Sequence, residues 1–177
     1  GRIATAGVGA RGLDFNDRPA NAPARRVQQP ALFDFNPRPS TVVLREVDAA
    51  TRELIFFTDA RSAKVAQMQQ RPIGTLLCWS SRIGWELRLR VQLQVQASGL
   101  NVSSRWARLK LTPAAQDYLS PLSPGSPMAQ RYAPERATRN HFAVVAARVL
   151  SIDWLELHAD GHRRAHFGAG PAQWLQP

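Results

Sequence analysis

The chain has 177 residues, of which 44% are hydrophobic, and it carries a net charge of +10. This size and composition predict one globular domain, with or without an irregular arm. No run of about 18 apolar residues occurs, so we expect no membrane-spanning helix. The single cysteine, Cys78, excludes an intrachain disulfide and suits a cytoplasmic protein.

Arginine supplies nearly all of the positive charge, because Lys64 and Lys110 are the only lysines. Planar guanidinium groups bind phosphate and carboxylate with two parallel hydrogen bonds. A basic protein of this kind could bind nucleic acid. The arginines are scattered along the sequence and form no dense run, so nucleic-acid binding remains an alternative and is not the favoured function.

Residues 1–29 are rich in Gly, Ala, Arg, Asn and Pro, which indicates an irregular N-terminal arm. Gly7, Gly9 and Gly12 fit a G-x-G-x-x-G pattern. A dinucleotide site needs a strand before that pattern and a helix after it, and residues 14–19 have no helical pattern. We therefore interpret the glycines as part of the arm, and we expect residues 30–177 to form the domain.

The next elements are three strands and a helix. Residues 31–35 fit a short strand before two prolines, and residues 41–47 are β-branched and apolar, which predicts a confident strand. Residues 53–58 should pair back on it as a hairpin. Asp59 or Ser62 is expected to cap a helix that runs to about Gln70, where Pro72 and Gly74 end it.

The strongest pattern follows residues 75–80, which predict another strand. From Trp85 to Gln96, apolar and polar residues alternate strictly, which predicts a long strand with one buried and one wet face. Residues 101–110 and 112–119 are expected to be helical, and 121–134 to be a loop. Residues 141–157 and 162–167 should form strands around a turn at Asp160 and Gly161. Five or six strands with few helices predict a mainly β fold, a small closed or split barrel.

The turn between the second strand and the first helix could bind phosphate. It holds Arg61, Ser62 and Lys64 at a helix start, where free backbone N–H groups and the helix dipole favour an anion. Taken by themselves, these residues fit a solvated helix start with a serine cap better than a phosphate site.

Five segments, in this order, resemble one family. They are STVVLR at 40–45, FFTD with Ser62 and Lys64 at 56–64, WELR at 85–88, YLSPLSPGS at 118–126, and a close with Trp154, HRRAHF at 162–167 and WLQP at 174–177. Together they resemble the pyridoxamine 5′-phosphate oxidase-related FMN-binding split barrels over about residues 30–177. The resemblance implies a split-barrel homodimer with FMN at the interface.

The resemblance also implies which residues contact each ligand. The expected cofactor contacts are Val43, Leu44, Arg45, Phe57, Thr58, Arg61, Ser62, Lys64, Glu86, Trp154, Arg164 and His166. The expected substrate contacts are Tyr118, Ser126 and His162. Arg61 would supply the charge that relatives place where Ala63 stands here. Glu86, which replaces a glutamine, also fits an ordinary residue of a wet strand face.

Other departures limit the expected activity. Ser40 replaces a cation of the family motif, and Leu122 stands where relatives clamp the substrate phosphate with arginine. An apolar side chain cannot replace a bidentate cation. The chain thus looks closest to the branch that lacks this arginine, and we expect no true pyridoxamine phosphate oxidase activity.

The favoured function is an FMN-dependent oxidoreductase acting on an unidentified small molecule, because the flavin carries the chemistry. The alternative is a flavin-binding domain without turnover. No side chain is assigned as a catalytic acid or base. His158, His162 and His166 are spaced as metal ligands on a helix would be, but Gly161 interrupts them in a hairpin, so no metal site is expected.

Overall fold

The computed structural model describes residues 40–129 and 141–177. The predicted arm 1–29, the short strand 31–35 and part of the predicted loop lie outside these residues. The described elements are β1 (Leu44–Asp48), β2 (Glu53–Asp59), α1 (Ala63–Gln70), β3 (Ile73–Ser80), β4 (Trp85–Gln96), α2 (Leu100–Leu109), the 3₁₀ helix η1 (Pro113–Tyr118), β5 (Phe142–Glu156), β6 (Arg163–Phe167) and β7 (Gln173–Leu175). No helix among them is long and apolar enough to cross a membrane.

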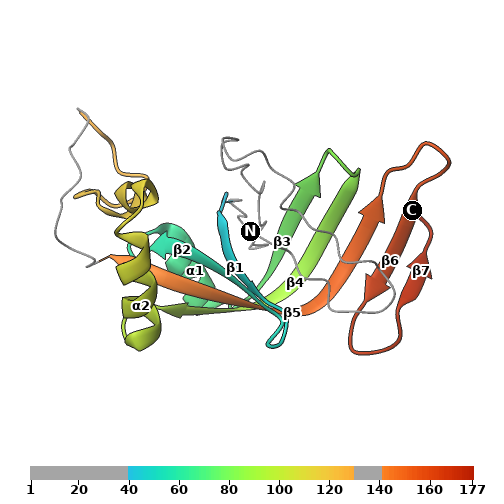
Figure 1. The fold of residues 1–177 in the computed structure, drawn as a ribbon, viewed down its shortest axis with the longest axis horizontal. Coiled ribbons are helices and arrows are strands. Elements are labelled where there is room, and N and C mark those ends of the chain that lie inside the picture. Colours follow the sequence, from blue (N-terminus) through green and yellow to red (C-terminus); the bar gives the residue numbers. More distant parts are fainter. Residues whose placement is uncertain (1–39, 130–140) are drawn as a thin grey trace.

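One antiparallel sheet contains all the described strands, in the order β1-β2-β5-β4-β3 (Figure 1). Strand β5 is the longest and has two different neighbours along one edge. Its first half, residues 142–148, pairs with β2, whereas its second half, residues 152–156, pairs with β6. Strand β4 runs along its whole opposite edge. The fold is therefore mainly β, as the sequence predicted.

The first apolar core lies inside the curved part of the sheet. It gathers Val42 before β1, Leu54 and Phe56 of β2, Leu76 of β3, Leu89, Val91 and Leu93 of β4, and Val145 and Ala147 of β5. Met68 of α1 packs into the same cluster. Side chains from β1, β2 and β3 line one shared apolar hollow. The two edge strands thus face each other across this core without pairing, as in a barrel that is split along one side.

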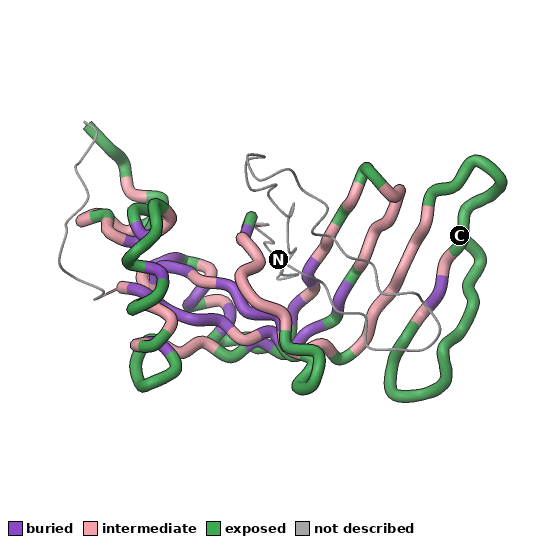
Figure 2. Tube along the Cα trace, viewed as in Figure 1, coloured by how far each residue is buried: buried purple, intermediate pink, exposed green. Residues whose placement is uncertain are grey.

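A second apolar core covers the outer face of β2 and the first half of β5. Ile55, Phe142 and Val144 of the sheet pack there against Val102 of α2 and Tyr118 of η1. Phe142 is the centre of this core, since its ring contacts those of Phe57, Trp106 and Tyr118 at centroid distances of 5.0, 5.2 and 5.4 Å. Both faces of the sheet are therefore buried here (Figure 2).

Two β-bulges interrupt the register and change which way side chains point. In β1, Leu44 pairs with Phe56 and Glu46 with Ile55, so Arg45 is the extra residue. In β5, Val149 and Ser151 pair with neighbouring residues of β4, so Leu150 is the extra residue. Beyond Leu150 the alternation of β5 is inverted: its even-numbered residues take the face of the first core, and its odd-numbered residues take the opposite face.

The predicted elements match the structure closely, with four differences. Strand β1 begins at Leu44, three residues later than predicted. Strand β4 has the predicted bounds, with Leu89, Val91 and Leu93 buried and Arg88, Arg90 and Gln92 exposed. The predicted helix at 112–119 is a 3₁₀ helix. Strand β3 begins at Ile73, so Gly74 lies inside the strand and does not end α1. Strand β7 was missed, because it has only three exposed residues.

Candidate functional site

The turn after β2 is tightly built from its own backbone. The N–H of Ser62 donates to the carbonyl of Asp59 at 3.0 Å, and that of Val65 donates to the carbonyl of Ser62 at 2.8 Å. The N–H of Ala60 donates to the carbonyl of His141 at 2.6 Å, which fastens the turn to the start of β5. Thr58 and Ser62 are both buried. Ser62 occupies the N-cap position of α1, but its side chain makes no capping hydrogen bond.

Lys64 lies in the first turn of α1, two residues after that cap. It is half-buried and forms no ion pair with any residue that the structure describes. Burial lowers the pKa of its ammonium group, because desolvation disfavours the charged form. An anion bound at this turn would stabilise the charged ammonium and so offset the cost of its burial.

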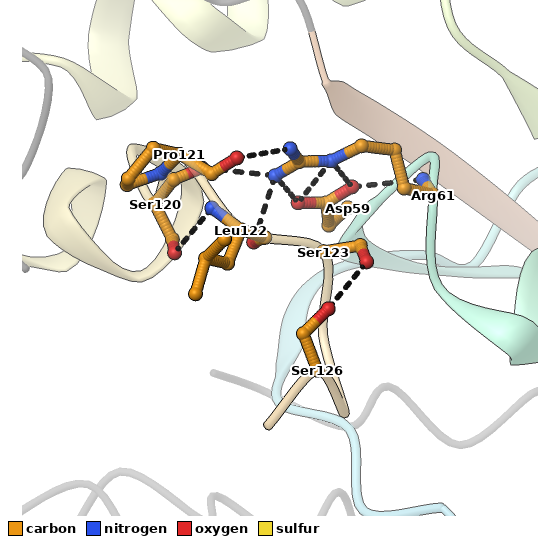
Figure 3. A network of polar contacts seen from close by, with 7 residues as sticks. All are labelled: Asp59, Arg61, Ser120, Pro121, Leu122, Ser123 and Ser126. Atoms are coloured by element: carbon orange, nitrogen blue, oxygen red, sulfur yellow. Dashed lines mark hydrogen bonds and ion pairs between the residues drawn. The ribbon is translucent and has the colours of Figure 1, made fainter. Parts of the chain in front are cut away.

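Arg61 contacts two other parts of the chain (Figure 3). Its Nε and Nη2 donate to the two carboxylate oxygens of Asp59, at 3.0 and 2.7 Å. Its Nη1 donates to the carbonyl of Pro121, and its Nη2 donates to the carbonyls of Ser120 and Leu122, at 2.9–3.1 Å. The sequence interpretation gave this guanidinium the phosphate charge that Ala63 lacks; the structure directs it to Asp59 and to the segment after η1.

Arg45 lies beside the second core. Its Nη2 is 3.4 Å from the hydroxyl of Tyr118, and its guanidinium carbon is 5.9 Å from the centre of the Phe57 ring. The structure therefore brings together an expected cofactor residue and an expected substrate residue. Nε of Arg45 is buried and has no hydrogen-bond partner among the described residues. Val43 and Leu44 precede it, and Leu44 packs on the first core.

Ser126 lies in the segment after η1, beyond the carbonyls that Arg61 binds. Its hydroxyl is 2.8 Å from that of Ser123, and the backbone N–H of Leu122 donates to the hydroxyl of Ser120 (Figure 3). The segment from Ser120 to Ser126 is thus held both internally and by Arg61.

Glu86, Arg164 and His166 lie together on one face of the sheet at its other end. Cross-strand pairs connect Arg88 with Asp153 and Asp153 with His166. Arg164 holds Asp153 with two hydrogen bonds of 3.0 and 2.6 Å. The hydrogen bonds from Arg164 are the main reason that the pKa of Asp153 lies below its ordinary value of 3.8.

Glu86 has a single close partner among the described side chains, since its Oε1 is 2.6 Å from Nη2 of Arg88. That oxygen is buried, and the contact lacks hydrogen-bond geometry, so the two groups form an ion pair only.

Trp154 lies on the opposite face from Glu86, Arg164 and His166. It pairs in register with Leu87 and Ala165, and its ring contacts those of Trp85 and Trp174 at 5.1 and 6.2 Å. Its buried Nε1 has no hydrogen-bond partner among the described residues. The expected cofactor residues of this end of the sheet therefore divide between two faces.

His162 lies in the loop between β5 and β6, where its Nδ1 accepts a hydrogen bond from the backbone N–H of His158 at 3.3 Å. It is exposed and belongs to the opposite end of the sheet from Tyr118 and Ser126 (Figure 1). One chain therefore does not assemble the three expected substrate residues. Within the described ranges 40–129 and 141–177, no three His, Cys, Asp or Glu residues are grouped to hold a metal ion.

No protein-family model and no curated protein matches the sequence. Solved structures do match. A pyridoxamine 5′-phosphate oxidase-related, FMN-binding protein from Nostoc punctiforme PCC 73102 is 23% identical, with a TM-score of 0.71 over 87% of this chain and 89% of that chain. PhzG from Burkholderia lata 383, in complex with tetrahydrophenazine-1-carboxylic acid, is 15% identical, with a TM-score of 0.68 over 87% and 83%. The chain has the FMN-binding split-barrel fold.

A third split-barrel protein is more distant. It is related to general stress protein 26, belongs to the pyridoxinephosphate oxidase family, and comes from Clostridium acetobutylicum. It is 10% identical, with a TM-score of 0.53 over 81% of this chain and 85% of that chain. The fold class expected from the sequence motifs, a mainly β split barrel with few helices, is therefore confirmed.

Sequence reasoning missed some residues of this split barrel. Asp59 was expected to be a helix cap, but its carboxylate is the partner of Arg61. Asp153, which holds Arg164, and Trp85 and Trp174, which flank Trp154, were not singled out. The spacing Asp59-x-Arg61 was the one local signal, because residues two apart around a turn can form an ion pair.

Proposed function

We propose that this chain binds FMN and acts as a flavoprotein oxidoreductase on a small molecule. One observation carries the proposal. Within an FMN-binding split-barrel fold, Lys64 is a half-buried cation that forms no ion pair with a described carboxylate, and it lies at the turn where the resembled family binds the FMN phosphate. A charged group in that state is stable when it meets an opposite charge. The phosphate of FMN would supply it.

The described residues fit such a ligand in three further respects. Ser62 has a hydroxyl that caps nothing and stands next to the free N–H groups of α1. Arg45 is the extra residue of the β1 bulge, and its buried Nε has no hydrogen-bond partner among the described residues. Leu44 lies on β1 directly after Val43, and Phe57 and Thr58 lie on the paired strand β2, which leads to this turn, so we propose that these four residues border the flavin. Arg61 supports the turn and does not hold the phosphate.

We propose that the site is completed by a second copy of the chain. Glu86, Arg164 and His166 lie at the far end of the sheet from Lys64 and Arg45 (Figure 1). A homodimer would bring that end of one chain to the phosphate turn of the other. The same arrangement would offer a partner to Nε1 of Trp154 and would bring His162 to Tyr118 and Ser126.

Bound FMN would supply hydride or electron transfer, since the flavin performs that chemistry itself. The residues of the chain would bind and orient: Lys64 and Ser62 at the phosphate, and Arg45 and Tyr118 beside the substrate. No side chain is assigned as an acid or base. A flavin domain without turnover is distinguished by mixing the loaded protein with a reduced nicotinamide: an oxidoreductase bleaches the flavin absorbance, and an inert domain does not.

The experiment that tests the phosphate site compares FMN with riboflavin, which lacks the phosphate. Lys64→Gln should weaken FMN binding by about tenfold or more, because a hydrogen bond to a charged group contributes about 1.5–3 kcal/mol. Riboflavin binding should change little. Lys110→Gln, an exposed lysine at the end of α2, is the matched control. Equal losses for both ligands would remove Lys64 from the phosphate site, and a wild-type protein that binds neither ligand would overturn the function.

Pyridoxamine 5′-phosphate should not be a substrate of the FMN-loaded protein. Leu122 is apolar, and only its backbone makes hydrogen bonds, with Arg61 and with Ser120. Without a cation there, the substrate phosphate would be poorly placed, and placement can account for several kcal/mol of a barrier. Pyridoxal phosphate formed at about one turnover per second or faster, a rate typical of enzymes, would contradict this proposal.

We also propose that the protein works in the cytoplasm. Its single thiol, Cys78, is partly buried, and burial raises its pKa to about 11, which keeps it unreactive. A protein with one inert thiol and no disulfide is suited to a reducing compartment. Fractionation of cells that produce the full-length protein tests this, and recovery in an exported fraction would contradict it.

A further inference from the structure

The Asp59–Arg61 pair joins two parts of the chain that are sixty residues apart in sequence. Asp59 ends β2 and binds Arg61 twice: its carboxylate accepts from the backbone N–H of Arg61 at 2.8 Å and from the guanidinium at 2.7 Å. The same guanidinium reaches the carbonyls of Ser120, Pro121 and Leu122 (Figure 3). Three consecutive carbonyls thus depend on one side chain.

This network is partly shielded from water, with Asp59 as its most buried member and Ser120 at its exposed edge. Of the Asp59 side chain 6% is exposed, and of the Arg61 side chain 23%. Charge-assisted hydrogen bonds in such a setting are stronger than neutral ones, and removing one partner leaves buried groups unsatisfied. A lysine at position 61 would keep the charge, but its single ammonium could not reproduce the planar fork of donors.

The pair is placed between the two parts of the candidate site. Arg61 stands directly before Ser62 and Lys64, which we assign to the phosphate of FMN. The segment that it binds follows Tyr118 and leads to Ser126, which we assign to the substrate. Tyr118 is fixed at one end by its ring contact with Phe142, and the Ser123–Ser126 contact closes the other end.

We propose that Asp59 and Arg61 form a latch that holds the segment Ser120–Ser126 on the turn before α1, so that the substrate residues are fixed relative to the phosphate site before any ligand binds. Arg61 is in this view a positioning residue. The link to ligands rests on the proposed function, whereas the latch itself does not. Such preorganisation reduces the ordering that a ligand would otherwise have to impose.

Hydrogen exchange of the full-length, ligand-free protein tests the latch. In Arg61→Gln and in Asp59→Asn, the hydrogen-bonded backbone amides of this segment, those of Leu119, Leu122 and Ser126, should exchange about tenfold faster or more, because local opening no longer breaks a charged network. Arg61→Lys should give an intermediate rate. Arg105→Gln is the matched control, because Arg105 forms a similar bidentate ion pair with Glu46 that joins α2 to β1. Its loss should leave the exchange rates within residues 119–126 unchanged.

Unchanged exchange of residues 119–126 in both Arg61→Gln and Asp59→Asn would overturn the latch. Should Arg61→Gln not fold, Arg61→Lys carries the same test. A rise of equal size in Arg105→Gln would also overturn it, because the effect would then be general loss of stability.

Ligand binding separates a latch from a direct phosphate contact. Arg61→Gln should weaken FMN and riboflavin by the same factor, so that their affinity ratio stays that of the wild type, unlike in Lys64→Gln. A selective loss of FMN with unchanged exchange would make Arg61 a phosphate ligand and overturn the proposal. A wild-type protein that binds no flavin would overturn the proposed function. The exchange measurement on the ligand-free protein would still show whether the latch exists.

Discussion

The two ends of the sheet differ in how completely they are covered, although β4 and β5 run through both (Figure 2). At the barrel end, where β5 pairs with β2, the residues from Phe142 to Val145 are at most 1% exposed, because the first core covers one face and α2 with η1 cover the other. We call the other end the wing; it comprises residues 77–80, 85–89, 151–156, 163–167 and 173–175.

The wing leaves large apolar side chains in water. Trp79 is 41% exposed, Trp174 is 74% exposed, and Phe167 and Leu175 are also exposed. These side chains divide between the two faces of the sheet, because Trp79 and Leu175 lie in register with Glu86 and Arg164, whereas Trp174 and Phe167 lie on the face of Trp154. One chain completes the barrel end alone, whereas the wing, which holds Glu86, Arg164 and His166, leaves apolar groups in water, and we propose that a second copy of the chain covers part of it.

The largest expected effect is on stability, and it is confined to the barrel end. Phe56→Ala removes a side chain that is 1% exposed and should lower the free energy of unfolding by about 3–5 kcal/mol, through lost burial and a cavity. Phe167→Ala, the same change in the wing, should cost about half of that or less. Urea unfolding of both variants measures the difference, and equal losses would refute the distinction between the two ends.

The second expected effect is on assembly, and it is confined to the wing. Trp79→Arg places a charge on the exposed wing surface, opposite Glu86 in the neighbouring strand, and should shift a homodimer to monomers. Desolvating a guanidinium in an interface is costly even where a carboxylate such as Glu86 pairs with it, and the apolar contact of the tryptophan is lost as well. Leu111→Arg changes an equally apolar, 81% exposed residue outside the wing and serves as the control. Sedimentation velocity at micromolar concentration gives the mass of each variant.

A wild-type monomer that still binds FMN would contradict the shared site. A Trp79→Arg dimer as stable as the wild type would place the interface elsewhere on the molecule.

The smallest expected effect is the pH dependence of the wing. Arg164 holds the pKa of Asp153 below 3.8, so the stability from this pair is complete above that pH and is lost as the pH falls through the lowered pKa. Because the pair is partly solvated, it should contribute about 0.2–1 kcal/mol. The difference in melting temperature between the wild type and Asp153→Asn should therefore shrink toward pH 2. A constant difference would mean that Asp153 acts through packing.

The order of elements could be predicted from the sequence because their signals are local. Strict alternation from Trp85 to Gln96 defines β4 to the residue, and an apolar run of six residues at 142–147 is typical of a strand buried on both faces. The turn residues Asp160 and Gly161 separated β5 from β6. The spacing of five short motifs was enough to indicate the split barrel, since each motif belongs to one element and the elements follow one another in a fixed order.

What the sequence could not determine are the contacts between distant residues. Strand β7 forms only because β6 offers it an edge, so three exposed residues at 173–175 carried no signal of their own. The bulge at Leu150 inverts the alternation of β5, and this inversion places Trp154 and Asp153 on opposite faces from those that a regular strand would give them.

Arg61 is the clearest case of what only the tertiary structure decided. The sequence interpretation offered it as a substitute for the motif's arginine, whose position Ala63 occupies, because nothing in the local sequence shows where the carbonyls of residues 120–122 lie. The sequence determined that a cation stands at this turn and that Lys64 follows it. The fold decided that Arg61, and not Lys64, is paired with a carboxylate of the chain. A guanidinium binds whichever acceptors the folded chain brings within hydrogen-bond distance, here Asp59 and the carbonyl of Pro121.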